Sequence, residues 1–388
     1  MSDPRAISLG EDFHRGKVAQ IQAALDGLAL DGLLLLNNNN VIYASGFYHT
    51  PSERPLGLYI PAVGEPTFYI PLLELENVQT SWVTDIRTYF EYPGEENPIL
   101  WMVRECGAAR LGIDQASYPL YQRITGQGTA LTVTPLVEEM RWVKSPAEVD
   151  LVAQAALYAD YCLQHVLDNA GAIIKDGGTE LDILSACLAA TNVIMQRDLG
   201  DSFDIYGGTV VGTVHSGPRA ALPHGRPLER QPQVGETLIA GIGAIVGGYH
   251  AESGATFIIG EPTDDQMHCL NAAVACDTAA VETLRPGATC SQVNVAALGA
   301  LRDAGLNDAI RHRIGHGMGL QGHEGPWLAP GDETILTPNM VFSSEPGIYR
   351  PGVDGYRTIN SMVVTAGEAR VVSRFLAEHP PTSRIIEI

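Results

Sequence analysis

Positive charge is scarce in this chain of 388 residues. Acidic residues number 45 and basic residues 24, which gives a formal net charge of -21, and only three of the bases are lysines. Nucleic-acid phosphates and anionic lipid surfaces repel such a chain, so we expect neither nucleic acid nor membrane as a partner. The N-terminus lacks a basic stretch followed by an apolar run, and no apolar stretch reaches the roughly 18 residues of a membrane span. We therefore expect a soluble, cytoplasmic protein without a signal peptide.

Cysteine pairs with metal-binding spacing are also absent. The six cysteines are scattered, and none stands in a C-x-x-C arrangement. We therefore expect no disulfide framework and no structural zinc site, but free core thiols in a reducing compartment. Apolar residues make up 45% of the chain and charged residues 18%, which excludes a disordered chain.

The first part of the chain reads as a small α/β domain. Residues 13–30 predict an amphipathic helix, residues 33–36 a buried strand and residues 37–40 a polar turn. Two further strands are predicted at 57–61 and 67–70, with a turn between them. Because a domain usually holds roughly 100–200 residues, the chain is long enough for a second domain.

A sharp helix start marks the predicted domain boundary. Ser145 can cap the helix, Pro146 suits the first helical position, and Glu148 completes a capping box. We therefore place the two domains at residues 1–144 and 145–388.

The second domain mixes helices and strands in blocks. Helical patterns cover residues 146–169, 180–196, 265–284 and 291–304, strand-like stretches cover 209–214, 237–240 and 256–259, and strands and turns alternate over 310–365. This order predicts an α+β fold rather than a doubly wound sheet.

Histidine gathers in one part of the second domain. Seven of the 11 histidines lie between residues 215 and 323. Histidine titrates near neutral pH and binds metals, so the cluster favours acid/base or metal chemistry. Interleaved glycines strengthen that interpretation, because they let a ligand or the backbone approach closely.

Three motifs in this region carry a family resemblance. They are Ala-Leu-Pro-His at 221–224, Gly-His-Gly-Met-Gly-Leu at 315–320 followed by His323-Glu324, and Ser-Glu-Pro-Gly-Ile-Tyr at 344–349. These motifs resemble the pita-bread superfamily of methionine aminopeptidases, Xaa-Pro peptidases and creatinase, and residues 40–47 resemble the creatinase-type N-terminal domain. The resemblance implies a pita-bread catalytic domain after a smaller α/β domain. It also implies a homodimer in which the partner's N-terminal domain covers the site.

The resemblance further implies a metal site that this chain retains only in part. Metallopeptidases of the superfamily hold two ions with Asp, Asp, His, Glu and Glu, and the corresponding residues here are Gly241, Glu252, His316, Glu345 and Ile359. Because Gly241 and Ile359 offer no side-chain ligand, we expect no metal cofactor. If one divalent ion (Mn, Co or Zn) is bound, its predicted ligands are Glu252, His316 and Glu345. Side chains that could replace a missing ligand are Asn360, His250 and His215.

A metal-free site would leave Glu252 and Glu345 facing each other without a cation. A guanidinium, amidinium or ammonium group of a substrate would relieve their repulsion. By resemblance to creatinase, His224 is the general base that activates water and then protonates the leaving nitrogen. His316 and His323 would donate hydrogen bonds to the developing oxyanion, with Glu345 beside them. The residues predicted to bind the substrate are Glu252, Arg357, Tyr249, Phe47 and Arg54.

Three functional hypotheses follow. The leading one is a metal-free hydrolase that cleaves a C–N bond of a small, cationic amide or amidine, with a lyase as its variant. The alternative is a metal-dependent Xaa-Pro dipeptidase or aminopeptidase with an unusual metal site. The third is a non-catalytic binding protein, which the retention of His224, His316, His323 and Glu345 disfavours.

Overall fold

The structure is a computed structural model that describes residues 8–388, in which the chain forms two compact units. The N-terminal unit covers Ser8–Arg141 and the C-terminal unit Trp142–Ile388. The division falls slightly before the predicted boundary because Val143 and Lys144 already pair with the C-terminal unit. Val143 forms a β-bridge with Met340, and the Lys144 amide donates to the Asn339 carbonyl at 3.1 Å.

The N-terminal unit is built on one six-stranded mixed sheet with the strand order β4-β3-β2-β1-β5-β6. Its strands are β1 (Gly32–Leu35), β2 (Gly57–Pro61), β3 (Thr67–Pro71), β4 (Asp85–Tyr89), β5 (Arg110–Ile113) and β6 (Ala130–Val133). Its helices are α1 (Glu11–Gly27), α2 (Asn38–Ser45), α3 (Leu75–Val78), α4 (Pro98–Cys106), α5 (Tyr118–Thr125) and α6 (Leu136–Trp142). The predicted turn at residues 37–40 is wrong, because Asn37 is the N-cap of α2 and accepts a hydrogen bond from the Asn39 amide at 3.0 Å.

The C-terminal unit contains two sheets and a hairpin. The first sheet has the order β17-β9-β8-β7, and the second has the order β11-β10-β12-β15-β16. The strands of the first sheet are β7 (Thr209–Ser216), β8 (Thr237–Val246), β9 (Tyr249–Ile259) and β17 (Ile385–Ile386). Those of the second are β10 (Gly315–Gly317), β11 (Glu324–Leu328), β12 (Val341–Ser344), β15 (Asn360–Val363) and β16 (Arg370–Val371), and the hairpin is β13 (Gly347–Arg350) with β14 (Asp354–Arg357).

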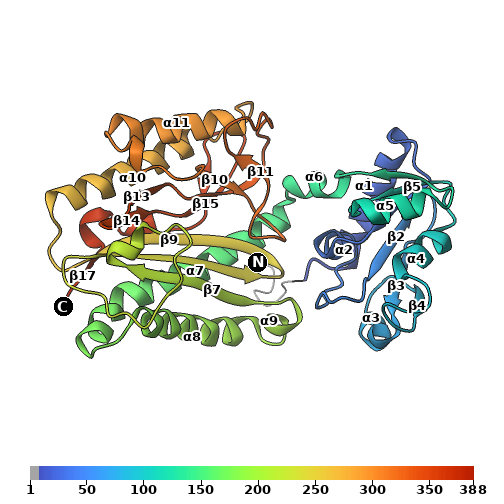
Figure 1. Ribbon diagram of the computed structural model, residues 1–388, viewed down its shortest axis with the longest axis horizontal. Helices are drawn as coiled ribbons and strands as arrows, with labels where there is room; N and C mark the ends of the chain where they lie inside the picture. Colours follow the sequence, from blue (N-terminus) through green and yellow to red (C-terminus); the bar gives the residue numbers. More distant parts are fainter. Residues whose placement is uncertain (1–7) are drawn as a thin grey trace. The chain divides into compact units, whose positions relative to one another are not determined.

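Helices cover the outer faces of these two sheets, so the C-terminal unit is an α+β structure as predicted (Figure 1). Its helices are α7 (Pro146–Lys175), α8 (Glu180–Leu199), α9 (Ser202–Ile205), α10 (Asp264–Thr283), α11 (Cys290–Asp303) and α12 (Phe375–Glu378). α7 packs on β8 and β9, and α8 packs on β7. α10 and α11 pack on each other, and their buried side chains share a core with Leu328, Phe342 and Met362 of the second sheet.

The start of α7 matches its sequence signals. The Ser145 hydroxyl accepts a hydrogen bond from the Glu148 amide at 3.3 Å, and the Glu148 carboxylate accepts one from the Ser145 amide at 2.7 Å. All six cysteines lie within residues 8–388 and are free, and each of them except Cys106 is buried, as predicted.

The hairpin of β8 and β9 is longer than predicted, and it carries part of the site. Its turn needs glycine, because Gly247 and Gly248 have φ values of 56° and 80°. Successive side chains of a strand point to opposite faces. Ser253 of β9 therefore points toward α7, where its hydroxyl donates to Asp160 at 2.7 Å, whereas Glu252 points toward the second sheet.

Candidate active site

The candidate catalytic side chains converge where the two sheets of the C-terminal unit meet. They are Glu252 on β9, His316 on β10, His323 just before β11 and Glu345 just after β12. A bridge between Gly254 and Ile359 joins β9 to the end of the second sheet. The Ser361 hydroxyl also accepts from the Glu252 amide at 2.9 Å and donates to the Glu252 carbonyl at 2.7 Å. Residues far apart in sequence are thus brought together by strand pairing.

His316 is completely buried and lies between two carboxylates. Its Nδ1 is 3.0 Å from the Gly317 carbonyl oxygen, which can only accept, so Nδ1 carries the hydrogen. Its Nε2 is 3.2 Å from Glu345 Oε1 and 3.8 Å from Glu252 Oε2, without hydrogen-bond geometry to either. Ionised carboxylate oxygens can only accept hydrogen bonds. Next to them, Nε2 of His316 therefore either carries a proton of its own or binds a cation through its lone pair.

His323 stacks on His316 at the edge of the cluster. The ring centroids are 3.7 Å apart, and the ring planes differ by 21°. His323 Nε2 is 3.8 Å from Glu252 Oε1, and the His323 side chain is 55% exposed, so a substrate can reach it. The other Glu252 oxygen accepts a hydrogen bond from the Ser343 hydroxyl at 2.8 Å, which fixes the carboxylate. Sequence reasoning gave no role to Ser343, although it lies two residues before Glu345.

The two carboxylates of the cluster are shifted in opposite directions. Burial raises the pKa of the Glu252 carboxyl, and the charge of Glu345 adds to this effect. Burial also acts to raise the pKa of Glu345, but the neighbouring His316 and Arg357 lower it to about 2. Burial acts to lower the pKa of His316, but the two carboxylates raise it overall. The cluster therefore keeps Glu345 ionised and favours a cation at His316.

Arg357, on β14, supplies a buried positive charge that acts on these carboxylates. It is 7% exposed, and its charge acts on both Glu252 and Glu345. Its Nη1 donates to the Pro223 carbonyl at 2.8 Å, and its backbone is fixed to the Thr256 hydroxyl in both directions, at 2.8 and 3.0 Å. That Arg357 binds substrate stays a prediction.

Tyr349 and His312 extend the same cluster, and sequence reasoning missed both. His312 Nδ1 lies 2.6 Å from the Arg313 carbonyl and therefore carries its hydrogen, so the Tyr349 hydroxyl donates to His312 Nε2 at 2.8 Å. Burial raises the pKa of Tyr349 to about 12, although the charge of Arg357 opposes it. Tyr349 closes the motif at 344–349, which was the available signal for its role.

His224, the predicted general base, lies in an exposed turn after the short 3₁₀ helix η2 (Gly217–Ala221). Burial lowers the pKa of both His312 and His323, and in each case the charge of His224 contributes further. The charge of His224 therefore acts on the cluster, and its imidazole is accessible to solvent, as a residue that exchanges protons with a substrate must be.

The carbonyl groups on either side of His224 are both held by side chains from other elements. The Pro223 carbonyl accepts from Arg357, and the Gly225 carbonyl accepts from the Thr213 hydroxyl at 2.6 Å. Gly225 also packs against the ring of His215, where a Cβ would lie only 3.0 Å from a ring carbon. The backbone at His224 is therefore fixed although its side chain is free to solvent.

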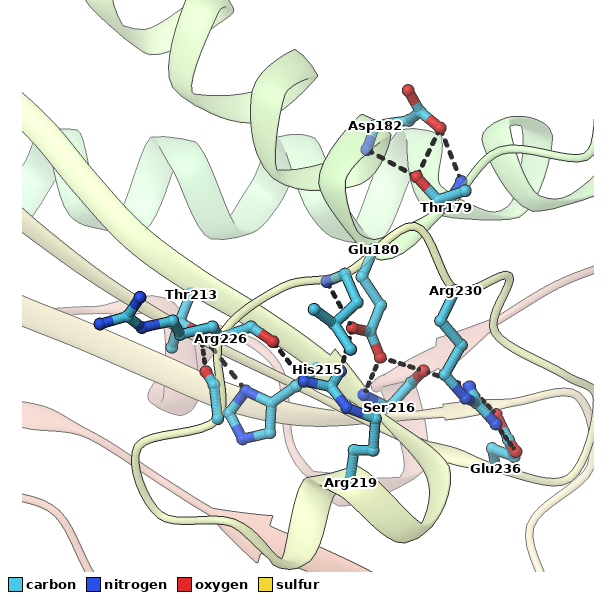
Figure 2. Close-up of polar contacts among 12 residues, drawn as sticks. Thr179, Glu180, Asp182, Thr213, His215, Ser216, Arg219, Arg226, Arg230 and Glu236 are labelled. Atoms are coloured by element: carbon cyan, nitrogen blue, oxygen red, sulfur yellow. Dashed lines mark hydrogen bonds and ion pairs between the residues drawn. The ribbon is translucent and has the colours of Figure 1, made fainter.

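The base of the same loop is closed by a buried carboxylate, as Figure 2 shows. Glu180, at the start of α8, is completely buried and accepts from the Ser216 amide at 2.8 Å and the Ser216 hydroxyl at 2.9 Å. It also accepts from the Arg219 guanidinium and from the Leu228 amide at 3.0 Å. One carboxylate thus ties both ends of the 217–228 segment, and Arg219 further donates to the Arg226 carbonyl.

The side chains proposed as replacement ligands have other partners. Asn360 donates to Asp277 at 2.6 Å, and His250 Nδ1 lies 3.0 Å from the Gly319 carbonyl. His215 is completely buried, and burial lowers its pKa to about 3. None of these three belongs to the group of donor atoms that converge among residues 8–388.

One predicted substrate-binding residue lies away from Glu252, and two others belong to the N-terminal unit. Tyr249 is on the opposite face of β9 from Glu252, because the two are an odd number of residues apart, and its hydroxyl donates to Glu148 of α7 at 2.7 Å. The structure therefore contradicts its predicted place at the site. Phe47 is buried in the N-terminal unit against Phe68, and Arg54 of that unit forms an ion pair with Glu91 at 2.6 Å.

One divalent ion fits the donor set of this cluster. Ligand atoms of Glu252, His316 and His323 lie within 4.8 Å of one another. His316 Nε2 is a buried nitrogen without a hydrogen-bond partner, and its Nδ1–H is oriented by a carbonyl, as is usual for a metal-binding histidine. Among the three candidate ligands, His323 therefore replaces Glu345, which was predicted from the sequence. Glu345 Oε1 still lies 3.2 Å from His316 Nε2.

A second ion does not fit. Gly241 and Ile359 carry no donor atom, and the space in front of Gly241 is filled. A Cβ at Gly241 would lie 2.8 Å from Arg357 Nη2 and 3.3 Å from Ile359 Cδ1.

Comparison with known proteins identifies the family. Residues 150–366 match the metallopeptidase family M24, and residues 17–143 match the creatinase/prolidase N-terminal domain. The chain belongs to metallopeptidase family M24. Its two units are thus a creatinase-type N-terminal domain and a pita-bread domain, and it is a hydrolase of the Xaa-Pro peptidase/creatinase family.

Individual relatives agree with this assignment. The chain is 30% identical to a probable dipeptidase PepE of Mycobacterium tuberculosis over 370 residues, which cover 91% of this chain and 92% of that one. It is 26% identical to an Xaa-Pro dipeptidase of Pyrococcus horikoshii over 371 residues, or 94% and 98% of the two chains. The crystal structure of dipeptidase PepE from Mycobacterium ulcerans superposes with a TM-score of 0.84 at 30% identity, over 97% of this chain and 99% of that one. Within residues 8–388, no helix is both long and apolar enough to span a bilayer.

Proposed function

We propose that this M24 hydrolase cleaves the amide bond of a dipeptide or a similarly small amide at the Glu252, His316, His323 and Glu345 cluster. The convergence of Glu252, His316 and His323 donor atoms within 4.8 Å carries the proposal. Similarity to a probable dipeptidase PepE and to an Xaa-Pro dipeptidase supports the substrate class. A divalent ion held by these three residues would supply Lewis acidity, polarising a carbonyl group or lowering the pKa of bound water.

A cationic substrate is not required by this arrangement. That hypothesis rested on two carboxylates without a positive partner, and the positive charge of Arg357 acts on both of them. The raised pKa of His316 means that its imidazole can be protonated and so can supply a second positive charge. The charge of the cluster is then close to balanced without the substrate, which favours a neutral amide or a zwitterionic dipeptide over a guanidino compound.

The protein side chains have distinct proposed roles. His224 takes a proton from the attacking water and returns it to the leaving nitrogen, because it is exposed and its backbone is held on both sides. His323 is the accessible donor toward the carbonyl oxygen of the substrate, and its stacking on His316 orients it. Loss of one such donor typically reduces the rate on the order of 100-fold.

A metal-free form of the same chemistry is the second candidate. One observation favours it: the two carboxylates raise the pKa of His316, so a proton on Nε2 can occupy the position that an ion would take. His316 would then be a fixed imidazolium beside Glu345. Both candidates use His224 as the base, and they differ in whether an ion lies among Glu252, His316 and His323.

Metal analysis and a substrate screen distinguish these candidates. The protein is purified without chelator, its metal content per subunit is measured, and Xaa-Pro dipeptides, other dipeptides and small amides are assayed with and without added Mn²⁺, Co²⁺ or Zn²⁺. Dipeptide hydrolysis that chelation abolishes and one equivalent of ion restores supports the metal-dependent form. Hydrolysis that is indifferent to chelation supports the metal-free form. Absence of hydrolysis under every condition refutes the proposed function.

We also propose that the active form is a homodimer in which Phe47 and Arg54 of the second subunit approach the site. The family resemblance supports this proposal. Sedimentation equilibrium should then give about twice the subunit mass of 41.6 kDa. A monomer that retains full activity would refute it.

A further inference from the structure

One buried carboxylate of the C-terminal unit has no part in the chemistry proposed above. Asp277 is only 8% exposed and belongs to the buried face of α10, together with Leu270, Ala273 and Ala280. A polar or charged group in such a place is costly unless other groups of the protein bond to it. The hydrogen-bond partners of Asp277 therefore indicate what the residue does.

Asp277 joins two neighbouring strands of the second sheet. Its Oδ1 accepts from the Ser344 hydroxyl of β12 at 2.7 Å, and its Oδ2 accepts from the Asn360 side-chain amide of β15 at 2.6 Å. Ser344 and Asn360 are directly opposite each other in the register of these strands. The carboxylate therefore connects the last residue of β12 to the first residue of β15.

The opposite face of the same two strands contacts Glu252. Because successive side chains of a strand point to opposite faces, Ser343 and Ser361 point away from α10. The Ser343 hydroxyl donates to the Glu252 carboxylate at 2.8 Å, and the Ser361 hydroxyl donates to the Glu252 carbonyl at 2.7 Å. One face of the strand pair thus fixes Glu252, and the other face is fixed by Asp277.

Glu345 directly follows Ser344, so the place of its backbone depends on the contact between Ser344 and Asp277. The Glu345 amide itself donates to the Ile314 carbonyl at 2.7 Å, and the Ile314 amide donates to the Asn294 side chain of α11 at 3.0 Å. Side chains of α10 and α11 therefore fix the backbone from which the Glu345 carboxylate extends.

The other partner of Asp277 is also held on its far side. The Asn360 side-chain oxygen accepts from the Ser373 hydroxyl at 2.8 Å, and the Ser373 hydroxyl accepts from the Ser361 amide at 3.0 Å. Removal of the Asp277 carboxylate would leave the Ser344 hydroxyl and the Asn360 amide as buried donors without their acceptor. The two strand ends would then move until those donors find another partner.

We propose that Asp277 is a positioning residue for the reaction, which holds Glu345 beside His316 by joining Ser344 to Asn360. The inference rests on the proposed function in one respect, the part that Glu345 plays in hydrolysis. The position of Glu345 itself can be measured without any substrate.

The first test is structural. Crystal structures of the wild type and of Asp277→Leu, grown under the same conditions, give the distance between Glu345 Oε1 and His316 Nε2. We expect a distance near 3.2 Å in the wild type and a clearly longer one in the variant. Ser344→Ala, which removes only one hydroxyl, is tested with the same expectation if Asp277→Leu does not fold. An unchanged position of Glu345 in the folded variant overturns the inference, whether or not a substrate is known.

The second test is kinetic and includes a rescue. Asp277→Leu should lower kcat for an Xaa-Pro dipeptide or for the best amide of the substrate screen, because a displacement of about 1 Å can reduce a rate on the order of 100-fold. The double variant Asp277→Asn with Asn360→Asp exchanges the two partners. It again places a donor opposite an acceptor, so most of kcat should return.

Gln266→Leu is the matched control for stability. Gln266 is also buried on α10, but its side chain donates to the Gly235 carbonyl at 2.8 Å and does not contact Ser344 or Asn360. This variant should lower Tm without the loss of kcat. An equal loss of kcat in Gln266→Leu, or no recovery in the folded double variant, overturns the inference, because the effect would then be one of general stability.

The two tests separate this inference from the proposed function. If the wild type hydrolyses no substrate of the screen but Glu345 moves in Asp277→Leu, the proposed function is refuted and the positioning of Glu345 by Asp277 is supported. If the wild type is active and Asp277→Leu changes neither kcat nor the position of Glu345, the positioning role is refuted and the proposed function is not.

Discussion

His215 should make the folded protein sensitive to mild acid. It is completely buried on β7, its Nε2 has no hydrogen-bond partner, and burial together with the charges of Arg357 and Arg219 lowers its pKa to about 3. In the unfolded chain the same side chain has a pKa of about 6.5. The unfolded state therefore binds the extra proton first, so stability is complete above about pH 6.5 and falls as the pH drops toward 3. One pKa unit corresponds to about 1.4 kcal/mol, so the loss at pH 5 is about 2 kcal/mol.

Urea unfolding of the wild type and of His215→Leu at pH 8 and at pH 5 measures this contribution. Between the two pH values the wild type should lose about 2 kcal/mol more of its unfolding free energy than the variant. The comparison between pH values removes any constant effect of the substitution on packing. His268→Leu is the control, because His268 is exposed and should keep the pH dependence of the wild type. Equal pH dependence in the wild type and His215→Leu would show that His215 titrates normally in the folded state.

Three further outcomes are expected. His224→Ala should lower kcat by about 10²–10⁴-fold because it removes the proposed general base, and it should leave Tm unchanged because the side chain is exposed. An unchanged kcat in steady-state assays would reject His224 as the base. Lys144→Met should destabilise by about 3–5 kcal/mol in urea unfolding, because it removes the buried ammonium group that lies 2.9 Å from the buried Glu324 carboxylate. Glu324→Leu in the same chain should recover most of the loss. No recovery in the double variant would contradict the charge-burial explanation. Ser145→Ala should cost about 1 kcal/mol of stability through loss of the α7 cap, and a change below about 0.3 kcal/mol would contradict it.

The sequence predicted an element correctly where the interactions that form it lie between neighbouring residues. The capping box at Ser145 and Glu148 forms as its spacing predicts. The strands at 57–61 and 67–70 also form, since their short apolar runs and the turn between them lie within a few residues. The turn predicted at 37–40 was wrong because asparagine favours helix caps as well as turns, and residues 41–45, which continue α2, are all buried.

Strand lengths in the C-terminal unit depended on tertiary contacts. β8 and β9 continue through Gly241, Gly243 and Gly254, although glycine weakens a strand pattern. At Gly241 and Gly254 the missing Cβ is replaced by side chains from β14 and its neighbourhood, which only the folded chain brings there. The face occupied by Tyr249 was likewise undetermined until the register of β9 was known.

The sequence by itself determined the family and the two-domain order, because motifs such as those at 221–224, 315–320 and 344–349 are contiguous and specific. The same motifs predicted which side chains are reactive. It also indicated that Gly241 and Ile359 cannot ligate a metal. Only the tertiary structure decided that Arg357 fills the space beside Gly241, that His323 stacks on His316, and which nitrogen of His316 faces the carboxylates. Those facts depend on distances between strands that are far apart in the chain. Helix caps and turns leave a pattern in neighbouring residues of the sequence, whereas packing and charge effects between distant residues leave none.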